Sequence, residues 1–277
     1  MTKIVKADGS VEPFKESKLR TSLKNSGAAP GEIEDILTRI ENDLYEGITT
    51  EEIYRKAFAY LRDTDAPPIA ARYSLRRALF GLGPTGFPFE DFRGRIFEAE
   101  GYTVTTGTII EGKCVAHELD VAAYKEDHAF VAEAKFHARP GIKSDLQVAL
   151  YCYARKLDLE EQKICFEDYC GIKDFMIVTN TKFTSTAKRY AECVGLQLLG
   201  WDYPRHANLH DRIKATGLYP ITVLQTLTEG QKRMLIEKSA IVCSDLAEKP
   251  HILRHIHLSE QKVEAVLSEV RQLCAKT

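Results

Sequence analysis

Asp120, Glu133 and Lys135 have the types and spacing needed to bind a divalent cation beside a phosphate. They fall in two runs typical of strands, residues 114–124 and 129–136, which are joined by four polar residues and therefore favour a β-hairpin. A turn centred on these polar residues would place Asp120 directly opposite Glu133, with Cβ atoms about 4.5–5.5 Å apart. Lys135 would share that face, because residues two apart on a strand point the same way.

The expected turn lies between Glu126 and Asp127, and the same register brings Glu118 opposite Lys135. Neighbouring carboxylates repel each other unless a positive charge compensates them. Mg²⁺ favours one or two carboxylates together with water and phosphate oxygens. The pattern therefore predicts a site for Mg²⁺ or Mn²⁺, an ion that lowers the pKa of bound water and polarises a phosphodiester.

Asp120 followed by Glu133-x-Lys135 resembles the motif of the PD-(D/E)xK nucleases. The surrounding sequence, over roughly residues 88–203, is most similar to the Mrr-like (type IV) restriction endonucleases. The resemblance implies a mixed sheet flanked by helices that hydrolyses DNA. It also implies that Asp120, Glu133 and the carbonyl oxygen of Ala134 hold the metal, while Lys135 orients the attacking water or offsets the developing negative charge.

Two further side chains complete the catalytic set that the resemblance implies. Phe89-Glu90 matches the opening helix of the family, where Glu90 would reach the metal through water. Gln147, on the helix after the site, takes the place of an additional polar residue that would hold Lys135 or the water. The implied catalytic residues are therefore Glu90, Asp120, Glu133, Lys135 and Gln147.

The first part of the chain combines a short hairpin with helices. Asp8-Gly9 between two extended runs predicts a type I′ turn, in which both central residues have positive φ. The periodicity that follows predicts four helices, at 16–26, 31–45, 50–62 (capped by Thr49 or Thr50) and 66–80. Such an arrangement resembles the ATP cone, the nucleotide-sensing module of ribonucleotide reductases and of a repressor of their genes. The resemblance is carried by Ile4-Val-Lys6-x-Asp8-Gly9-x-x-Glu12-x-Phe14, Lys18-Leu19 and Ala70-Ala-Arg72-Tyr73-x-Leu-Arg76.

An ATP cone implies a regulatory ligand, ATP or dATP. Lys6 and Lys18 are the expected phosphate partners, because an ammonium forms strong charge-assisted hydrogen bonds with phosphate. The resemblance assigns the backbone of Ile4 and Val5, and the side chain of Glu12, to the base or sugar. The chain has no G-x-x-x-x-G-K-[ST] motif, so nothing predicts ATP hydrolysis of the P-loop kind. A degenerate cone kept only as an oligomerisation surface is the alternative.

Composition and punctuation set the organisation. The chain has 277 residues with 38 Lys+Arg against 40 Asp+Glu, a balance that excludes a histone-like polycation. The stretch GLGPTGFP at 81–88 breaks the helical pattern, and a weaker break follows Trp201. We expect three domains: a cone at 1–84, a nuclease domain at 85–210 and a helical domain at 211–277.

The last domain shows two helix starts, a capping-box pattern at Thr228-Glu-Gly-Gln231 and an amphipathic run from about Ser259. The segment 252–263 loosely resembles a helix-hairpin-helix, a non-specific DNA binder, although His257 and Ser259 replace its glycines. A structural or dimerising helical tail is the alternative.

The N-terminal sequence MTKIVKADGS has no apolar leader, and no apolar run approaches the roughly 18 residues of a membrane span. The seven cysteines form no C-x-x-C pair and are expected to be reduced thiols, with a zinc site through Cys165 and Cys170 as a minor alternative. We expect a cytoplasmic homo-oligomer, a dimer or higher.

Three functions fit these features. The first is a metal-dependent DNA endonuclease regulated by ATP or dATP at the cone. The second is a non-catalytic, nucleotide-responsive DNA-binding regulator built on a nuclease scaffold. The third is a nuclease-fold interaction module.

Overall fold

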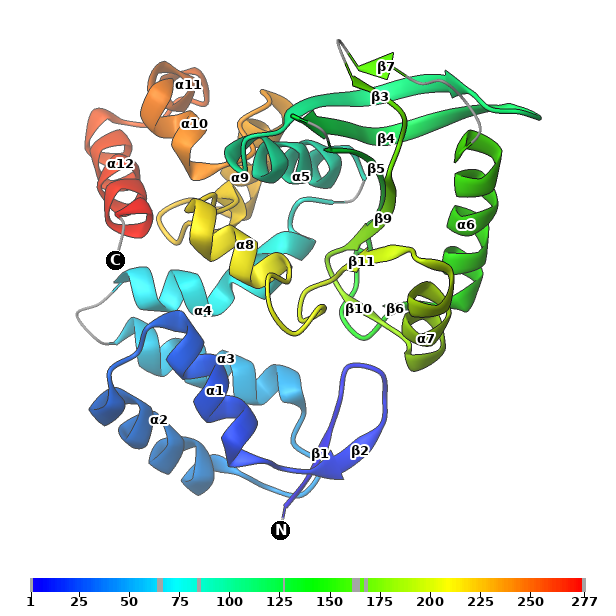
Figure 1. The fold of residues 1–277 in the computed structure, drawn as a ribbon. Coiled ribbons are helices and arrows are strands. Elements are labelled where there is room, and N and C mark those ends of the chain that lie inside the picture. The colour runs from blue at the N-terminus through cyan, green and yellow to red at the C-terminus, as the bar shows by residue number, and fades with distance from the viewer. Residues whose placement is uncertain are drawn as a thin grey trace. The chain divides into compact units, whose positions relative to one another are not determined.

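The computed structural model describes residues 2–63, 67–83, 86–126, 128–160, 165–166 and 169–275, with the backbone alone for 67, 165, 166, 169 and 170. The chain divides into two compact units, one formed by Met1–Ala78 with Ile221–Thr277 and the other by Leu79–Pro220. The elements confirm a mixed α/β protein with an N-terminal hairpin and helices, a central mixed sheet and a helical C-terminal region (Figure 1).

The first unit opens with a hairpin of β1 (Lys3–Val5) and β2 (Val11–Pro13), followed by α1 (Glu16–Ser26), α2 (Pro30–Asp43), α3 (Thr50–Arg62) and α4 (Pro67–Phe80). The prediction of a type I′ turn for the hairpin is wrong. Such a turn needs two successive residues with positive φ, whereas Gly9, with a φ of 79°, is the only residue of the loop that has one. Instead the loop spans residues 6–10. The Asp8 carboxylate accepts the backbone N–H and the hydroxyl of Ser10, which removes the need for a second left-handed residue.

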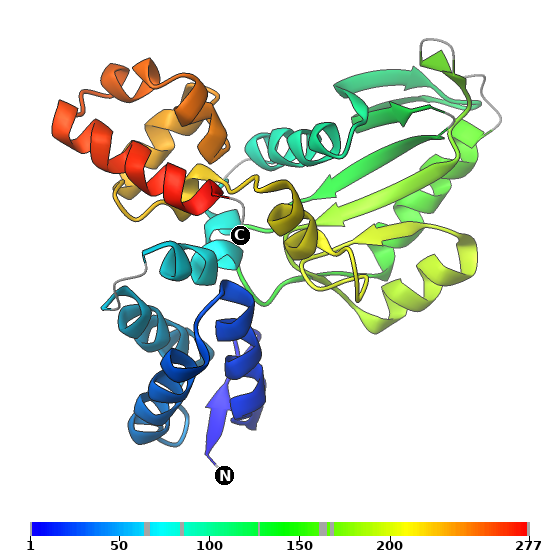
Figure 2. The ribbon, with the colours of Figure 1, turned by 60° about the vertical axis from the view of Figure 1, so that its left-hand side comes forward.

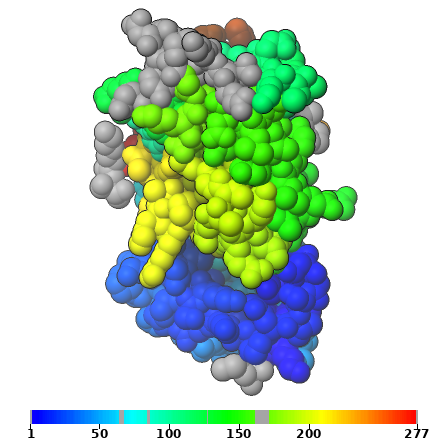
Figure 3. All heavy atoms as spheres, turned by 45° about the vertical axis from the view of Figure 1, so that its right-hand side comes forward, coloured from blue at the N-terminus to red at the C-terminus, as the bar shows by residue number. Residues whose placement is uncertain are grey.

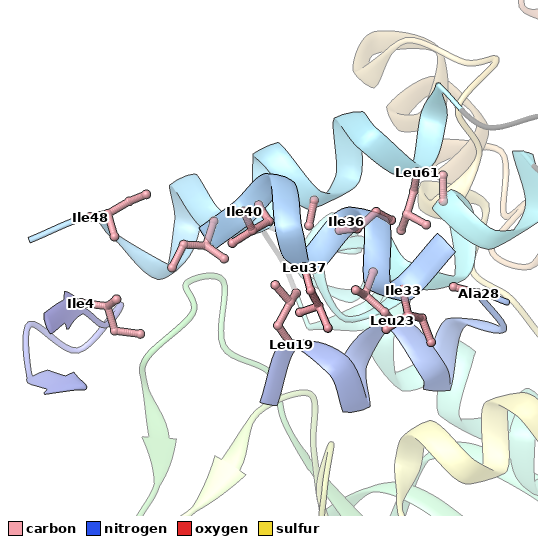
Figure 4. Close-up of a cluster of buried hydrophobic side chains, with 13 residues drawn as sticks. Ile4, Leu19, Leu23, Ala28, Ile33, Ile36, Leu37, Ile40, Ile48 and Leu61 are labelled. Carbon is pink, nitrogen blue, oxygen red and sulfur yellow. The ribbon is translucent and has the colours of Figure 1, made fainter. Parts of the chain in front are cut away.

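The helices of this region enclose an apolar core, as their sequence periodicity predicts. Thr49 caps α3 by accepting the Glu52 N–H, and the Glu52 carboxylate in turn accepts the Thr49 N–H, a complete capping box. Figure 4 shows side chains from α1, α2 and α3 converging on one cluster, in which Leu23 and Ile40 are fully or almost fully buried.

The same unit contains the C-terminal helices: the 3₁₀ turn η1 (Ile221–Val223), α9 (Glu229–Glu237), α10 (Cys243–Glu248), α11 (His251–His255) and α12 (Glu260–Cys274). Thr228 and Ser259 cap α9 and α12, as the sequence predicts. The hydroxyl of Thr222 donates to the carbonyl oxygen of Ala78 over 2.7 Å, so η1 is fastened to the end of α4.

The second unit is built on a five-stranded sheet of order β11-β9-β5-β4-β3. Its strands are β3 (Thr103–Glu111), β4 (Ala116–Lys125), β5 (His128–Lys135), β9 (Asp174–Thr179) and β11 (Gln197–Leu199). β3, β4 and β5 are antiparallel neighbours, whereas β5, β9 and β11 run parallel. Two short pairs accompany them, β6 (Lys143–Ser144) with β10 (Lys182–Phe183) and β7 (Cys165–Phe166) with β8 (Tyr169–Cys170).

Helices cover both faces of this sheet (Figure 2). Phe97 of α5 (Phe87–Ala99) meets Phe130 edge to face, with ring centroids 4.9 Å apart. Val131, which points to the opposite face, instead belongs to the cluster that includes Cys152 of α6 (Leu146–Glu160). α7 (Ser185–Val194) packs beside α6 on that face, and Figure 3 shows these two helices at the surface in green and yellow-green. The small helix α8 (Leu209–Thr216) completes the unit.

The β4–β5 register is the predicted one, from Val121↔Ala132 to Lys125↔His128. Asp127, at the predicted turn, lies outside the described residues. The ladder ends at Val121, so the prediction that Asp120–Glu133 and Glu118–Lys135 continue it is wrong. The physical reason is local: the Ala134 N–H donates to the Asp120 carboxylate, at 2.5 Å, instead of to the neighbouring strand.

In the part of the chain that the structure describes, no helix is both long enough and apolar enough to cross a membrane. The side chains of Cys165 and Cys170, which the minor zinc alternative requires, are not among those described.

Candidate functional site: a charged cluster between two helices

Asp120 lies outside the pairing on both sides of its strand. β3 pairs with β4 through Thr106↔Val121 and Thr108↔Leu119, and Gly107 between them has a φ of 60°. A left-handed conformation at this point favours glycine because other residues meet steric strain there. Asp120 therefore occupies a break in the sheet, with its Oδ2 atom held by the Ala134 N–H.

Glu133, on β5, is buried, and both of its carboxylate oxygens are engaged. Oε1 accepts a hydrogen bond from Lys135 Nζ at 2.6 Å, and Oε2 accepts one from Arg155 Nη1 of α6. Nη2 of the same guanidinium donates to the carbonyl oxygen of Glu118, whose own side chain is exposed. Arg155 is itself only 6% exposed, so it fixes Glu133 and the splayed end of β4 at the same time.

Electrostatics ties Asp120 to this pair. Burial raises the pKa of the Asp120 carboxyl, and repulsion from Glu133 raises it further. Burial alone would lower the pKa of Lys135, but its hydrogen bond and attraction to Glu133 outweigh burial and raise it. The two acids and the amine that the sequence grouped together are therefore neighbours, although they do not meet through a continuous ladder.

The helix α5 adds one acid and one base. Glu90 is half-buried, and burial followed by repulsion from Asp120 raises its pKa. Arg93 is fully buried, and its guanidinium donates no hydrogen bond to any residue that the structure describes. Burial lowers its pKa to about 10, whereas attraction to Asp120, Glu90 and Glu133 works in the opposite direction.

Gln147 lies on the helix after the site, as predicted, but it does not hold Lys135. It sits exposed in the first turn of α6, and no described hydrogen bond joins its side chain to Lys135. One turn later, the Tyr151 ring lies 5.5 Å from Lys135 Nζ and 5.4 Å from the centre of the Arg155 guanidinium. An aromatic face at such a distance attracts a cation, so Tyr151 occupies the place beside Lys135 that was predicted for Gln147.

The residues present fit a divalent cation of the Mg²⁺ type. Among the described residues, no three His, Cys, Asp or Glu side chains are grouped as metal ligands. Mg²⁺ does not need such a group, since it binds through one or two carboxylates and otherwise through water and phosphate. Asp120 supports this fit, because its Oδ1 atom accepts no described hydrogen bond. Repulsion from Glu133 also disfavours its ionised form, a cost that a bound cation would offset.

The predicted nucleotide-binding residues of the hairpin form a second group. Glu12 accepts a hydrogen bond from Lys18 at 2.6 Å and lies 3.8 Å from Lys6 Nζ. This hydrogen bond to Lys18 lowers the pKa of the Glu12 carboxyl. Ile4 is buried in the core, and the Val5 N–H already donates to the carbonyl oxygen of Ile48. The solvent-accessible polar part of this group is therefore Lys18, which is exposed, with the partly exposed Lys6 and Glu12.

Comparison with known proteins identifies two families that match parts of this chain and one relative that matches most of it. Residues 2–79 match the ATP cone domain, and residues 219–274 match the AF1548-like C-terminal family. An uncharacterized protein of Archaeoglobus fulgidus is 36% identical over 180 residues, which cover 65% of this chain and 98% of that relative. The chain belongs to the AF1548-like family.

A solved structure agrees with this assignment. The crystal structure of AF1548, described as a protein of unknown function, superposes with a TM-score of 0.56 at 32% identity and covers 70% of this chain and all of that one. The match of residues 2–79 confirms the resemblance to an ATP cone seen in the N-terminal sequence, and it points to nucleotide-dependent regulation of this AF1548-like protein.

Sequence reasoning missed Arg93 and Arg155, and both left a signal. The apolar stripe of α5 contains Phe89, Phe92, Ile96 and Phe97, and Arg93 falls within it. On α6 the buried positions Ala149, Cys152 and Leu159 share a face with Arg155. An arginine on an apolar helix face predicts that acids lie nearby, because a buried charge is costly without compensation. In this AF1548-like fold β4, β5 and α5 supply these acids, which attract Arg93 and, through Glu133, bind Arg155.

Proposed function

We propose that this protein is a metal-dependent DNA endonuclease of the Mrr-like, PD-(D/E)xK kind, and that ATP or dATP bound at the cone regulates it. The observation that carries the proposal is the junction of Asp120, Glu133 and Lys135 at a break in the sheet, with an acid of α5 beside them. The order of the elements, helix, three antiparallel strands, helix and a parallel strand, agrees with the fold that the sequence resembles.

Each residue has a role that its surroundings support. Asp120, Glu133 and the Ala134 carbonyl would hold Mg²⁺ or Mn²⁺, which supplies an activated water and a polarised phosphate. Lys135, protonated and partly exposed, is positioned to offset the charge that develops on the phosphate. Glu90, half-buried beside Asp120, would hold a water at the metal.

The proposal is tested by incubating plasmid and linear DNA with Mg²⁺ and either the wild-type chain or Lys135→Ala. Lys156→Ala, which removes the same charge from the neighbouring surface of α6, is the matched control. Cleavage that depends on metal, survives in the control and is lost in Lys135→Ala supports the endonuclease. Repeating the assay with ATP and with dATP tests regulation, and identical cleavage and sedimentation with and without nucleotide would contradict it.

A second function is favoured by one observation. Glu133 is fully neutralised by Lys135 and Arg155 without any metal, as expected of a scaffold that has lost catalysis. In that case the protein is a nucleotide-responsive DNA-binding regulator, and the same assay would show DNA binding without cleavage by either form. If the assay showed neither DNA binding nor cleavage, the remaining function would be an interaction module.

A further inference from the structure

Six charged side chains in the second unit act on one another near the point where the pairing of β4 with β5 ends. All are buried or partly buried, and three are acids and three are bases: Glu90, Asp120, Glu133, Arg93, Lys135 and Arg155. When all six are ionised, their charges cancel. The cluster therefore has no net charge before any ligand binds.

The two bases that hold Glu133 differ in their freedom to move. The Arg155 side chain is 6% exposed and is fixed twice, by Glu133 and by the Glu118 carbonyl. The Lys135 side chain is 29% exposed, and besides Glu133 its described contact is the Tyr151 ring. A ligand that needs a Glu133 oxygen can therefore displace Lys135 far more readily than Arg155.

A divalent cation alone would give this cluster a charge of about +2 in a partly desolvated place, where uncompensated charge is costly. A phosphodiester and a hydroxide each bring one negative charge and restore neutrality. The phosphate also offers the displaced Lys135 ammonium a new charge-assisted hydrogen bond.

We propose that metal binding at this site is conditional on a phosphodiester, because Arg155 and Lys135 occupy both oxygens of Glu133 until phosphate takes over Lys135. This inference rests on the proposed function for the identity of the metal ligands. Arg155 is then a positioning residue that prevents the protein from binding the metal when no DNA is bound. By linkage, the metal must strengthen DNA binding by the same factor as DNA strengthens metal binding.

The test is direct measurement of Mn²⁺ binding to the full chain by the electron paramagnetic resonance of the free ion. Each titration is made with Mn²⁺ alone, with a short duplex carrying uncleavable phosphorothioate linkages, and with the same duplex carrying uncharged methylphosphonates. For the wild type we expect the Kd for Mn²⁺ to fall at least about tenfold with the charged duplex, within the usual range of coupling, and to stay unchanged with the uncharged one.

The variant Arg155→Met should bind Mn²⁺ more tightly without DNA. Its Kd for Mn²⁺ should therefore differ by no more than about threefold between the titrations with and without the charged duplex. Lys156→Met, the adjacent residue on the same helix, should keep the wild-type coupling. Arg155→Lys keeps the charge but cannot span both acceptors, and should retain part of the coupling even if Arg155→Met proves too unstable to fold. Equal affinity with and without the charged duplex in the wild type, or undiminished coupling in Arg155→Met, overturns the inference.

Parallel cleavage assays separate the two proposals. Mn²⁺-dependent cleavage by a wild type that shows no coupling would remove this inference alone. Coupled Mn²⁺ and DNA binding without cleavage would remove the endonuclease and leave the inference standing. Absence of both Mn²⁺ binding and cleavage would remove both.

Discussion

The carboxylate of Asp120 accepts the backbone N–H of Ala134 at 2.5 Å, and this single contact ends the pairing of β4 with β5. A side chain has replaced a main-chain acceptor, so that the strands separate without leaving a buried donor unpaired. The same contact holds the Oδ2 atom of Asp120, whereas Oδ1 accepts no described hydrogen bond. It thus both opens the sheet and orients the acid that we propose as a metal ligand.

Asp120→Asn separates these two roles. The amide oxygen can still accept the Ala134 N–H, so we expect the melting temperature to change little. Removal of the negative charge should lower Mg²⁺-dependent DNA cleavage by at least about 100-fold, since outer-shell partners alone are worth about 10–100-fold. The measurement is cleavage rate together with thermal melting. Asp120→Ala, which cannot accept the hydrogen bond, should in addition lower the melting temperature, and equal melting of both variants would contradict this account.

Glu90→Gln should stabilise the fold at neutral pH. Burial raises the pKa of Glu90 in the folded chain, so its ionised form disfavours folding once the pH rises above that pKa. The amide removes this cost. We therefore expect a higher melting temperature than wild type at pH 7–8, and no difference below about pH 4, where the unfolded carboxyl is also protonated.

Asp91→Asn, at a more exposed position of the same helix, is the control for Glu90→Gln and should show no gain at neutral pH. Thermal melting between pH 4 and 8 provides the measurement. A Glu90→Gln variant that is less stable than wild type throughout this range would show that the carboxylate is held by favourable contacts instead.

Asp158 on α6 should confer a stability that is lost in acid. A hydrogen bond from the Cys114 thiol, with further bonds from His117 and from the N–H groups of Cys114 and Val115, lowers its pKa to about 2. A lowered folded pKa stabilises the fold above the unfolded pKa of about 3.9 and ceases to do so as the pH falls through the folded value. Asp158→Asn should therefore melt below wild type at pH 7, with a difference that shrinks between about pH 4 and pH 2.

Glu160→Gln, an exposed acid two residues further along α6, should melt like wild type across the same range. Circular dichroism of all three proteins from pH 2 to pH 7 makes the comparison. A constant difference for Asp158→Asn at every pH would mean that it acts through packing and not through its charge.

Local patterns predicted much of this fold, because the forces that set them are local. The alternation of apolar residues and the four polar residues between the strands gave the register of β4 with β5, and the capping residues gave the starts of α3, α9 and α12. The end of the ladder was not predictable in this way. It depends on whether a side chain or a strand captures the Ala134 N–H, and that competition is decided in three dimensions.

The partner of Glu133 shows the same limit more clearly. Arg155 lies 22 residues away along the chain, and only the packing of α6 on the sheet brings its guanidinium to the carboxylate. Its position on an apolar helix face was readable in the sequence, but the identity of the acid that it neutralises was not. The meeting of residues 1–78 and 221–277 in one unit is equally a product of long-range contact.

The last prediction concerns the cone. Lys18 and Lys6 flank Glu12, and the Lys18 side chain is 59% exposed, so its ammonium can leave the carboxylate for a phosphate at little cost. A hydrogen bond between charged groups contributes about 1.5–3 kcal/mol, which corresponds to about 10–100-fold in affinity. Lys18→Ala should therefore weaken ATP and dATP binding by that factor, measured by isothermal titration calorimetry.

Lys24→Ala, which removes a lysine from the last turn of the same helix, should leave the nucleotide affinity unchanged. Because Lys18 also restrains Glu12, Glu12→Gln should free the lysine and leave phosphate binding intact while weakening any contact of the carboxylate with the sugar. If Lys18→Ala and Lys24→Ala bound ATP and dATP as tightly as wild type, the phosphates would not lie beside this hairpin, and the cone would be an assembly surface instead of a sensor.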